Sequence, residues 1–195
     1  MNHIFRKEVE NLYKKYKEED SMKENRLDRW RNLEPESALF ISIVIRSQQT
    51  KHLLEIGTSN GYSTLWFADA LKSTNGKLTS IEIEKERTAY ASENLKKFGF
   101  NTNAELITTD AKSFLAQALP IYDMIFLDAE RKYYMEYWPD LKRLITQTNG
   151  AILCVDNVIS HQHEVSEFTE IIKLDEELIN TVINVGAGIL LVTKT

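Results

Sequence analysis

An apolar segment that runs directly into a glycine turn is the feature of this chain that most restricts its fold. Residues 53–56 read Leu-Leu-Glu-Ile, the turn spans Gly57 to Gly61, and a helical pattern follows from Tyr62 to about residue 72. In α/β proteins, a strand, a glycine-containing turn and a helix bring the backbone close to a nucleotide-like ligand. The segment therefore predicts the first strand, turn and helix of such a fold.

The spacing of the glycines restricts the ligand. A dinucleotide site requires Gly-x-Gly-x-x-Gly, but the second and third glycine positions are occupied here by Ser59 and Tyr62. A phosphate-binding P-loop ends in Gly-Lys-Ser/Thr, whereas this turn ends in Gly61-Tyr62-Ser63. We therefore expect a cofactor that has an adenosine but no phosphate, and S-adenosylmethionine is such a cofactor.

Two acidic residues fit this cofactor. Segment 77–83 alternates like a second strand, and Glu82 lies about twenty residues after the glycine turn, where a carboxylate accepts both ribose hydroxyls. Glu84 is a nearby alternative, and Glu82 is otherwise one more charge at a strand end. Glu55 interrupts the first strand. Because a buried carboxylate is costly unless it is paired, we expect it to face the cationic methionine end of the ligand, or to bind a backbone amide or a lysine.

From residue 51 onward, apolar strand-like segments alternate with helical ones. Strands are expected near 52–56, 77–83, 104–108, 122–128 and 150–156, and helices near 62–72, 85–98, 111–118, 132–146 and 163–174. Two further strands, 178–185 and 189–193, flank a tight glycine turn. The pattern predicts an α/β, Rossmann-like, mostly parallel sheet of seven strands with a C-terminal antiparallel hairpin, as in class I methyltransferases.

We expect one domain over residues 1–195, with residues 1–46 forming a helical segment before the sheet. Residues 3–19 place Phe5, Val9, Leu12 and Tyr16 at helical spacing, which predicts an amphipathic helix that packs on the domain or on a second subunit. Residues 20–34 are polar and irregular, and Pro35 would begin a helix that ends near residue 46. A homodimer is therefore one expectation.

Composition argues against several classes of protein. The net charge of −5 lacks the basic field of a protein that binds nucleic-acid phosphates, so a small-molecule substrate is expected. The single cysteine, Cys154, lies in an apolar segment and is expected to be buried. No apolar run approaches membrane-spanning length, so we expect no membrane association and a cytoplasmic location.

Two more strands end in acidic residues. Segment 122–127 runs into Asp128, and segment 151–155 runs into Asp156 and Asn157. If these strands are neighbours, the three side chains converge beyond their carboxyl ends, where ligands bind in open α/β sheets. Carboxylate and amide oxygens suit Mg²⁺. The alternative is that these acidic residues bind no metal and lie there only because acidic residues are common where strands end and helices begin.

At these residues the chain resembles the cation-dependent O-methyltransferases of the catechol and caffeoyl-coenzyme A type. The similar segments are 54–63, Ile81-Glu82-Ile83, Phe126-Leu127-Asp128-Ala129 and Val155-Asp156-Asn157-Val158. The resemblance implies that Asp128, Asp156 and Asn157 hold Mg²⁺ and that Asp110 lies at the adenine. Together with Glu55, which is expected at the ligand because of its place in the first strand, the predicted cofactor-binding residues are Gly57, Thr58, Ser59, Gly61, Tyr62, Ser63, Glu82, Ile83, Asp110, Ala111 and Asp128.

One position departs from that family. A lysine that acts as general base usually stands three residues after the first metal-binding aspartate, and here it is Arg131, in a bacterial subgroup with Asp-Ala-Glu-Arg. A guanidinium stays protonated, so Arg131 would instead stabilise a phenolate or bind a substrate carboxylate. Lys132 is the nearest substitute. His161 is a further candidate base, unless Ser160 and its neighbours only cap the helix near 163.

These residues predict methyl transfer from S-adenosylmethionine to a small, aromatic hydroxyl compound. Two alternatives stay open. The same fold could methylate a tRNA nucleotide, although the acidic balance weighs against it. The chain could also bind the cofactor without catalysis, with Arg131 marking a lost activity.

Overall fold

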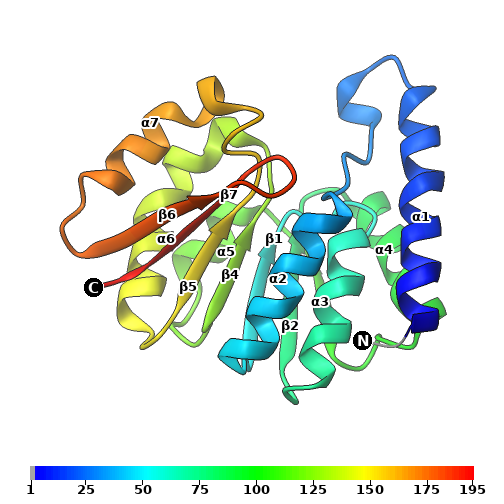
Figure 1. Ribbon diagram of the computed structural model, residues 1–195, viewed down its shortest axis with the longest axis horizontal. Helices are drawn as coiled ribbons and strands as arrows, with labels where there is room; N and C mark the ends of the chain where they lie inside the picture. Colours follow the sequence, from blue (N-terminus) through cyan, green and yellow to red (C-terminus); the bar gives the residue numbers. More distant parts are fainter. Residues whose placement is uncertain (1–2) are drawn as a thin grey trace.

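The computed structural model describes residues 3–195, which form a seven-stranded sheet between two layers of helices (Figure 1). The strand order is β3-β2-β1-β4-β5-β7-β6. The strands are β1 (His52–Ile56), β2 (Lys77–Glu82), β3 (Ala104–Thr108), β4 (Met124–Leu127), β5 (Ile152–Val155), β6 (Leu178–Ile183) and β7 (Ile189–Lys194). The pairs among β1 to β5 are parallel, and β7 runs antiparallel to both β5 and β6. The predicted fold class, including the C-terminal hairpin, is confirmed.

The helices divide between the two faces of the sheet. They are α1 (His3–Ser21), α2 (Pro35–Gln48), α3 (Tyr62–Lys72), α4 (Lys85–Phe98), α5 (Ala111–Gln117), α6 (Tyr134–Gln147) and α7 (Gln162–Lys173), with 3₁₀ turns η1 (Arg26–Asp28) and η2 (Arg131–Tyr133). On one face, the helices α1, α2, α3 and α4 form an apolar cluster with sheet side chains such as Leu53 of β1. On the other face, α5, α6 and α7 form a second cluster with sheet side chains such as Leu54 of β1. Successive residues of a buried strand point to opposite faces, so β1 contributes to both cores.

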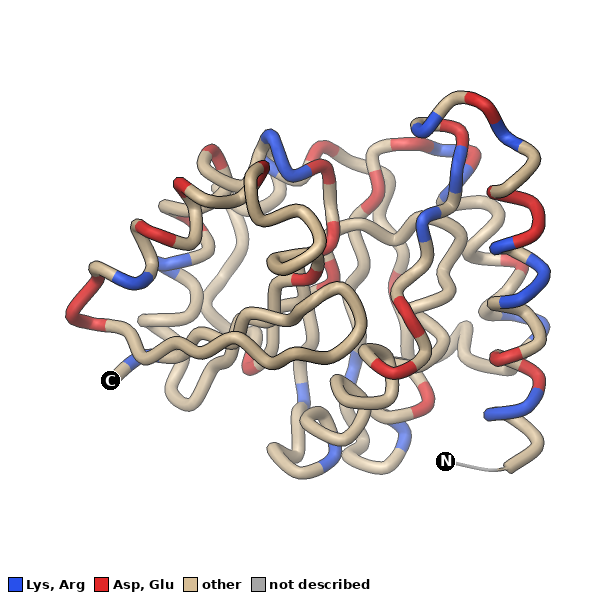
Figure 2. Tube along the Cα trace, turned by 45° about the horizontal axis from the view of Figure 1, so that its top comes forward, with Lys and Arg blue, Asp and Glu red and all other residues tan. Residues whose placement is uncertain are grey.

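The apolar stripe of α1 packs on the domain itself. Phe5, Val9 and Tyr16 are buried in the core that α3 and α4 share, and the ring of Phe5 meets that of Trp66 edge-on at 6.2 Å. Lys and Arg alternate with Asp and Glu along the rest of the helix (Figure 2). The stripe is therefore used within the chain. Cys154 is completely buried, as expected.

The four central strands end in register. Ile56 at the end of β1 is paired with Ile81 of β2 and with Leu127 of β4, and Leu127 is paired with Val155 of β5. The residues that follow these positions therefore share the carboxyl edge of the sheet, where ligands of open α/β sheets bind. No helix within residues 3–195 is long and apolar enough to cross a membrane.

Candidate active site

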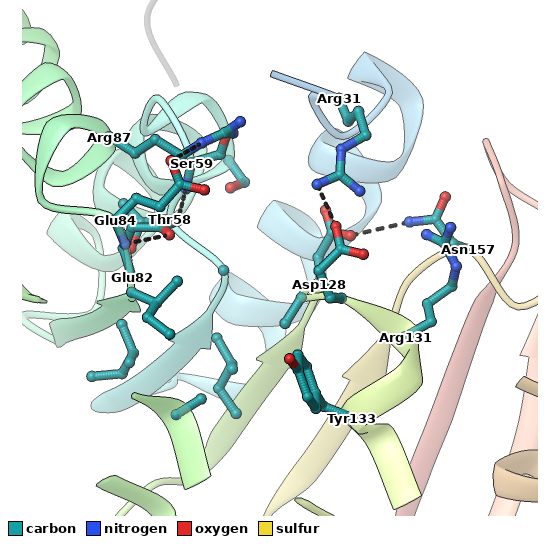
Figure 3. A pocket seen from close by; sticks show the side chains of 18 of the residues that line it. Arg31, Thr58, Ser59, Glu82, Glu84, Arg87, Asp128, Arg131, Tyr133 and Asn157 are labelled. Carbon is teal, nitrogen blue, oxygen red and sulfur yellow. Dashed lines mark hydrogen bonds and ion pairs between the residues drawn. The ribbon is translucent and has the colours of Figure 1, made fainter. Parts of the chain in front are cut away.

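A cavity of about 690 Å³ opens at this edge of the sheet. Figure 3 shows its labelled side chains in two groups. The glycine-turn half contains Thr58, Ser59, Glu82, Glu84 and Arg87, and the acid half contains Arg31, Asp128, Arg131, Tyr133 and Asn157. Most of the predicted site residues line this cavity: Gly57, Thr58, Ser59, Ser63, Glu82, Ile83, Asp110, Ala111, Asp128, Arg131, Asn157 and His161.

Only glycine fits at position 57 of the turn. Its φ is +105°, and a Cβ there would lie 2.2 Å from the backbone oxygen of Asp128. The N–H groups of Gly57 and Thr58 donate to the Ile81 carbonyl at 3.0 and 3.3 Å, so the turn is fixed to β2. Close packing against both neighbouring strands therefore shapes the floor of the cavity.

Backbone amides orient the Glu82 carboxylate. The N–H of Ser59 donates to Oε2 at 2.8 Å, and that of Glu84 donates to Oε1 at 3.0 Å. Each carboxylate oxygen can accept further hydrogen bonds. Glu82 is therefore held at the rim of the cavity with acceptor capacity for ligand hydroxyls.

Glu55 does not line the cavity, and the expectation that it faces the ligand is wrong. The side chain is completely buried behind the turn, where Ser63, Thr64 and Ser80 donate hydroxyl hydrogen bonds to its oxygens at 2.5, 2.7 and 2.5 Å. Burial raises its pKa to about 7. Three hydroxyls satisfy the carboxylate, so it is a structural group that reaches the cavity only through Ser63.

Gly61 and Tyr62 also lie outside the cavity lining. A Cβ on Gly61 would lie 2.9 Å from that of Ala91, so this glycine allows α4 to pack closely. The ring of Tyr62 is buried against Tyr13 and Trp66, on the far side of the turn from the cavity. Asp110 does line the cavity, but one of its oxygens accepts from the N–H of Ser113 at 2.8 Å and caps α5.

Asp128 and Asn157 of the acid half lie against Asp156, which is buried and does not itself line the cavity. The amide nitrogen of Asn157 donates to Oδ1 of Asp128 at 3.1 Å and to Oδ2 of Asp156 at 2.8 Å (Figure 3 shows the first contact). Asn157 has a φ of +69°, a left-handed conformation that non-glycine residues rarely adopt. The other oxygen of Asp156 is buried and has no hydrogen-bond partner among residues 3–195. An unpartnered buried carboxylate oxygen points to a missing ligand.

The electrostatics of this half favour a cation. Burial raises the pKa of both Asp128 and Asp156, and the repulsion between them and from Glu34 raises the pKa of Asp156 further. Within residues 3–195, no group of three or more His, Cys, Asp or Glu side chains is arranged to hold a metal ion. The side chains here offer two carboxylates and one amide, and a half-turn of the Asn157 amide group would present its oxygen instead of its nitrogen. Such oxygen ligands fit a hard divalent cation whose remaining coordination positions are filled by water or substrate oxygens.

Arg131 is already paired with a carboxylate. Its Nε and Nη2 donate to the two oxygens of Glu164 at 3.0 and 3.2 Å, in a bidentate pair that ties η2 to α7. The side chain is only 5% exposed. A substrate carboxylate, which the sequence led us to expect at Arg131, would therefore have to compete with Glu164.

The two other candidate bases lie differently. Lys132 is exposed and outside the cavity, with its ammonium over the ring of Tyr133 at 4.7 Å. His161 lines the cavity, and its Nδ1 lies 2.8 Å from Oγ of Ser160. Helix α7 begins at Gln162, and its N-cap is His161, the neighbour of Ser160; the His161 side chain makes no capping hydrogen bond.

The loop 22–34 is the part of the site that the sequence did not indicate. It contributes Arg26, Leu27, Arg29, Trp30, Arg31, Asn32 and Leu33 to the cavity wall. Trp30 is its anchor: the ring stacks on Tyr90 at 4.9 Å, and its indole N–H donates to Glu19 at 2.9 Å. A tryptophan amid polar residues was the available signal, since such a side chain rarely stays in solvent.

Comparison with known proteins agrees with this geometry. The profile of the family described as O-methyltransferase matches residues 9–195. The chain belongs to this family. The predicted resemblance is thus confirmed, and a catechol O-methyltransferase of Niastella koreensis is 33% identical over 132 residues. That match covers 66% of this chain and 58% of the relative, so the chain spans little more than half of that relative's length.

Solved structures of the family share the fold. An O-methyltransferase from Bacillus cereus in complex with SAH has a TM-score of 0.80 and 21% identity, over 100% of this chain and 92% of that one. The O-methyltransferase TomG from Streptomyces achromogenes, in complex with SAM, has a TM-score of 0.74 and 26% identity, covering 84% of this chain and 82% of that one.

Proposed function

We propose that the protein transfers a methyl group from S-adenosylmethionine to a hydroxyl oxygen of a small aromatic acceptor, assisted by a divalent cation. The observation that supports this most is that one cavity joins the glycine-turn half to the acid half. A methyl donor and a hydroxyl acceptor must lie side by side for in-line transfer, and the two halves provide adjacent sites of different chemistry.

The glycine-turn half suits the cofactor. Glu82, fixed by two backbone amides, would accept the ribose hydroxyls, and Ile83 beside it is 67% exposed and would contact the adenine. Asp110 and Ala111 form the opposite rim of this half. Gly57 and Thr58 line the cavity, and because Gly57 has no side chain, the methionine part of the cofactor would be able to approach the backbone of the turn there. S-adenosylmethionine carries no phosphate, in agreement with a turn that lacks a phosphate-binding lysine.

The acid half suits the acceptor. Asp128, Asp156 and Asn157 would hold the cation, which lowers the pKa of a bound hydroxyl. The acceptor oxygen then forms the new bond to the methyl carbon, the carbon–sulfur bond breaks, and S-adenosylhomocysteine leaves as a neutral thioether. Tyr133 lines this side, and its ring, 6.1 Å from that of Tyr137, would offer aromatic surface to a ring-shaped acceptor.

His161 is our candidate for the group that accepts the hydroxyl proton. Burial and the nearby Arg131 lower the pKa of its imidazole, so the ring is neutral at pH 7 and able to accept a proton. Arg131 cannot accept a proton because its guanidinium stays charged. Its ion pair with Glu164 instead positions η2 next to the cavity.

The test is a methyl-transfer assay with purified protein, S-adenosylmethionine, Mg²⁺ and a panel of catechols, with products detected by mass spectrometry. We expect a monomethylated product that needs the divalent cation. We expect His161→Asn to lower kcat by about a hundredfold, the usual contribution of a general base. Lys132→Ala, which changes an exposed residue outside the cavity, is the matched control and should keep wild-type turnover. Cofactor binding without any product would contradict the proposal and favour a binding protein.

A further inference from the structure

Six cationic side chains line the cavity, and they differ in how many of their donors are bound by groups of the chain itself. The six are Arg26, Arg29, Arg31, Arg87, Lys112 and Arg131. Arg131 is bound by Glu164, and the ammonium of Lys112 donates to the Glu136 carbonyl at 2.8 Å. These two cations therefore have partners that a ligand would have to displace.

Arg29 and Arg87 hold the loop 22–34 in place. The Arg29 guanidinium donates twice to the Lys23 carbonyl, at 3.1 and 2.9 Å. That of Arg87 donates to the Leu27 carbonyl at 2.6 Å and to Oγ of Ser59 at 2.9 Å, and so joins the loop to the glycine turn. Both arginines therefore serve the loop rather than the interior of the cavity.

Arg26 and Arg31 share a single carboxylate. Arg31 lies 2.6 Å from Glu130 through Nη2, and Arg26 lies 3.8 Å from the other oxygen of the same residue. Two guanidinium groups thus share Glu130, and Arg31 also interacts electrostatically with the nearby Asp128. A guanidinium has five N–H donors, and among residues 3–195 Glu130 is the only ion-pair partner of Arg31, so donors remain for a ligand.

The chain fixes Arg31 in an uncommon backbone conformation. Its φ is +53°, which non-glycine residues rarely adopt and which often accompanies a functional role. The carboxylate of Asp20 accepts from the N–H groups of both Trp30 and Arg31, at 2.7 and 2.9 Å. Figure 3 shows the side chain directed toward the part of the cavity that holds Asp128. The two hydrogen bonds to Asp20 therefore fix the backbone that carries the Arg31 side chain.

From this arrangement we infer that Arg31 binds a carboxylate on the acceptor, so that the preferred acceptor is an aromatic hydroxy acid rather than a neutral catechol. This inference rests on the proposed O-methyltransferase activity. A carboxylate matches the planar guanidinium in a bidentate pair, and Glu130 lies next to only one nitrogen of Arg31, so the side chain has further N–H donors for a ligand. The carboxylate binding that the sequence suggested for Arg131 is thereby assigned to Arg31, because Glu164 binds two nitrogens of Arg131 whereas Glu130 lies next to one nitrogen of Arg31.

The experiment compares two acceptors of nearly identical shape, 3,4-dihydroxybenzoate and 3,4-dihydroxybenzamide. We measure kcat/KM for each with the wild type, Arg31→Gln and Arg31→Lys. We expect the wild type to prefer the acid, and Arg31→Gln to lower the acid-to-amide ratio roughly tenfold or more, chiefly through KM for the acid. Arg31→Lys keeps the charge but not the bidentate geometry and should fall between the two. Arg6→Gln removes an exposed arginine on α1 that pairs with Glu10, and it should keep the wild-type ratio.

The outcomes separate this inference from the proposed function. Methylation of both acceptors with a ratio that Arg31→Gln does not change would overturn the role of Arg31 and leave the methyltransferase activity standing. A strong preference for a coenzyme A thioester of the same acid, lost in Arg31→Gln, would overturn the carboxylate in favour of a phosphate. Failure to methylate any acceptor would overturn the proposed function itself. In that case, dissociation constants of the acid and the amide on protein saturated with S-adenosylhomocysteine still test Arg31, and equal values would overturn its role as well.

Discussion

The two halves of the cavity differ in how far their polar groups are satisfied by the chain. In the glycine-turn half, backbone amides hold Glu82, and behind the turn three hydroxyls hold the buried Glu55. In the acid half, a buried oxygen of Asp156 has no partner within residues 3–195, and Arg26 and Arg31 compete for one carboxylate.

This difference indicates what each half is built for. A preformed, satisfied site binds the same cofactor in every turnover with little rearrangement. A site with uncompensated charges is costly in the absence of its ligands and is completed by them. We therefore expect substitutions in the glycine-turn half to affect stability and cofactor affinity, and those in the acid half to affect the acceptor and the cation.

The largest expected effect is that of Gly57→Ala. The added methyl group would lie 2.2 Å from the Asp128 backbone oxygen, so β1 and β4 would have to separate at the join between the two halves. We expect a loss of more than about 3 kcal/mol in the free energy of unfolding, measured by urea denaturation.

Gly99→Ala is the matched control for this substitution. Gly99 also has a positive φ, +72°, but a Cβ there meets no atom within 4 Å. The backbone strain alone should cost about 1 kcal/mol. Equal losses in the two variants would show that strain, rather than contact with Asp128, requires glycine at position 57.

The second prediction concerns Glu55 and pH. The folded-state pKa is about 7, above the ordinary value of 4.5 for a glutamate, so the folded state binds this proton more tightly than the unfolded state does. The stabilisation is therefore complete below pH 4.5 and is lost as pH rises through 7, by at most about 3 kcal/mol. In Glu55→Gln, this part of the decline in stability between pH 4.5 and 7 should disappear in denaturation curves. An unaltered pH profile would contradict the assignment of a buried, titrating Glu55.

The third prediction separates cofactor affinity from the rest of the site. Glu82→Gln replaces a charged acceptor by an amide, and charge-assisted hydrogen bonds contribute about 1.5–3 kcal/mol. We expect calorimetry to show S-adenosylhomocysteine binding weakened by roughly tenfold to a hundredfold. Glu84→Gln, at the exposed neighbour that the sequence left as an alternative, should bind within about twofold of the wild type. A larger effect at Glu84 would transfer the ribose role to it.

The smallest expected effect is that of Asp20→Asn. An amide can replace only one of the two acceptor oxygens that hold the N–H groups of Trp30 and Arg31, so Arg31 should become less well ordered. We expect a several-fold rise in KM for the acceptor, corresponding to about 1 kcal/mol, and a smaller change in cofactor affinity. Asp28→Asn, at an exposed position of the same loop, is the control. A larger loss for the cofactor than for the acceptor would contradict the division of the cavity.

The glycine-turn half could be predicted because its chemistry is local in the sequence. Strand, turn and helix follow one another, and Glu82 comes from the next strand of a regular alternation. Glu55 was misplaced because its partners, above all Ser80, are brought to it by strand pairing, which no local pattern reveals.

The acid half could be predicted only in part. Asp128 and Asp156 follow two strands whose pairing the sequence left as a condition, and the pairing of β4 with β5 brings the two carboxylates together. The roles of Arg31, Glu130 and Glu164 were not foreseeable, because each depends on a contact between segments far apart in the chain. An irregular stretch such as residues 20–34 has no periodicity from which to infer its position.

The most direct test of this account is a Mn²⁺ titration, read by EPR, of protein saturated with S-adenosylhomocysteine. The account predicts one bound Mn²⁺ per chain in the wild type and in Lys132→Ala, and loss of that site in Asp156→Asn, which removes the buried unpartnered carboxylate. Absence of bound Mn²⁺ in the wild type, or equal binding by Asp156→Asn, would contradict the assignment of the acid half as a cation site.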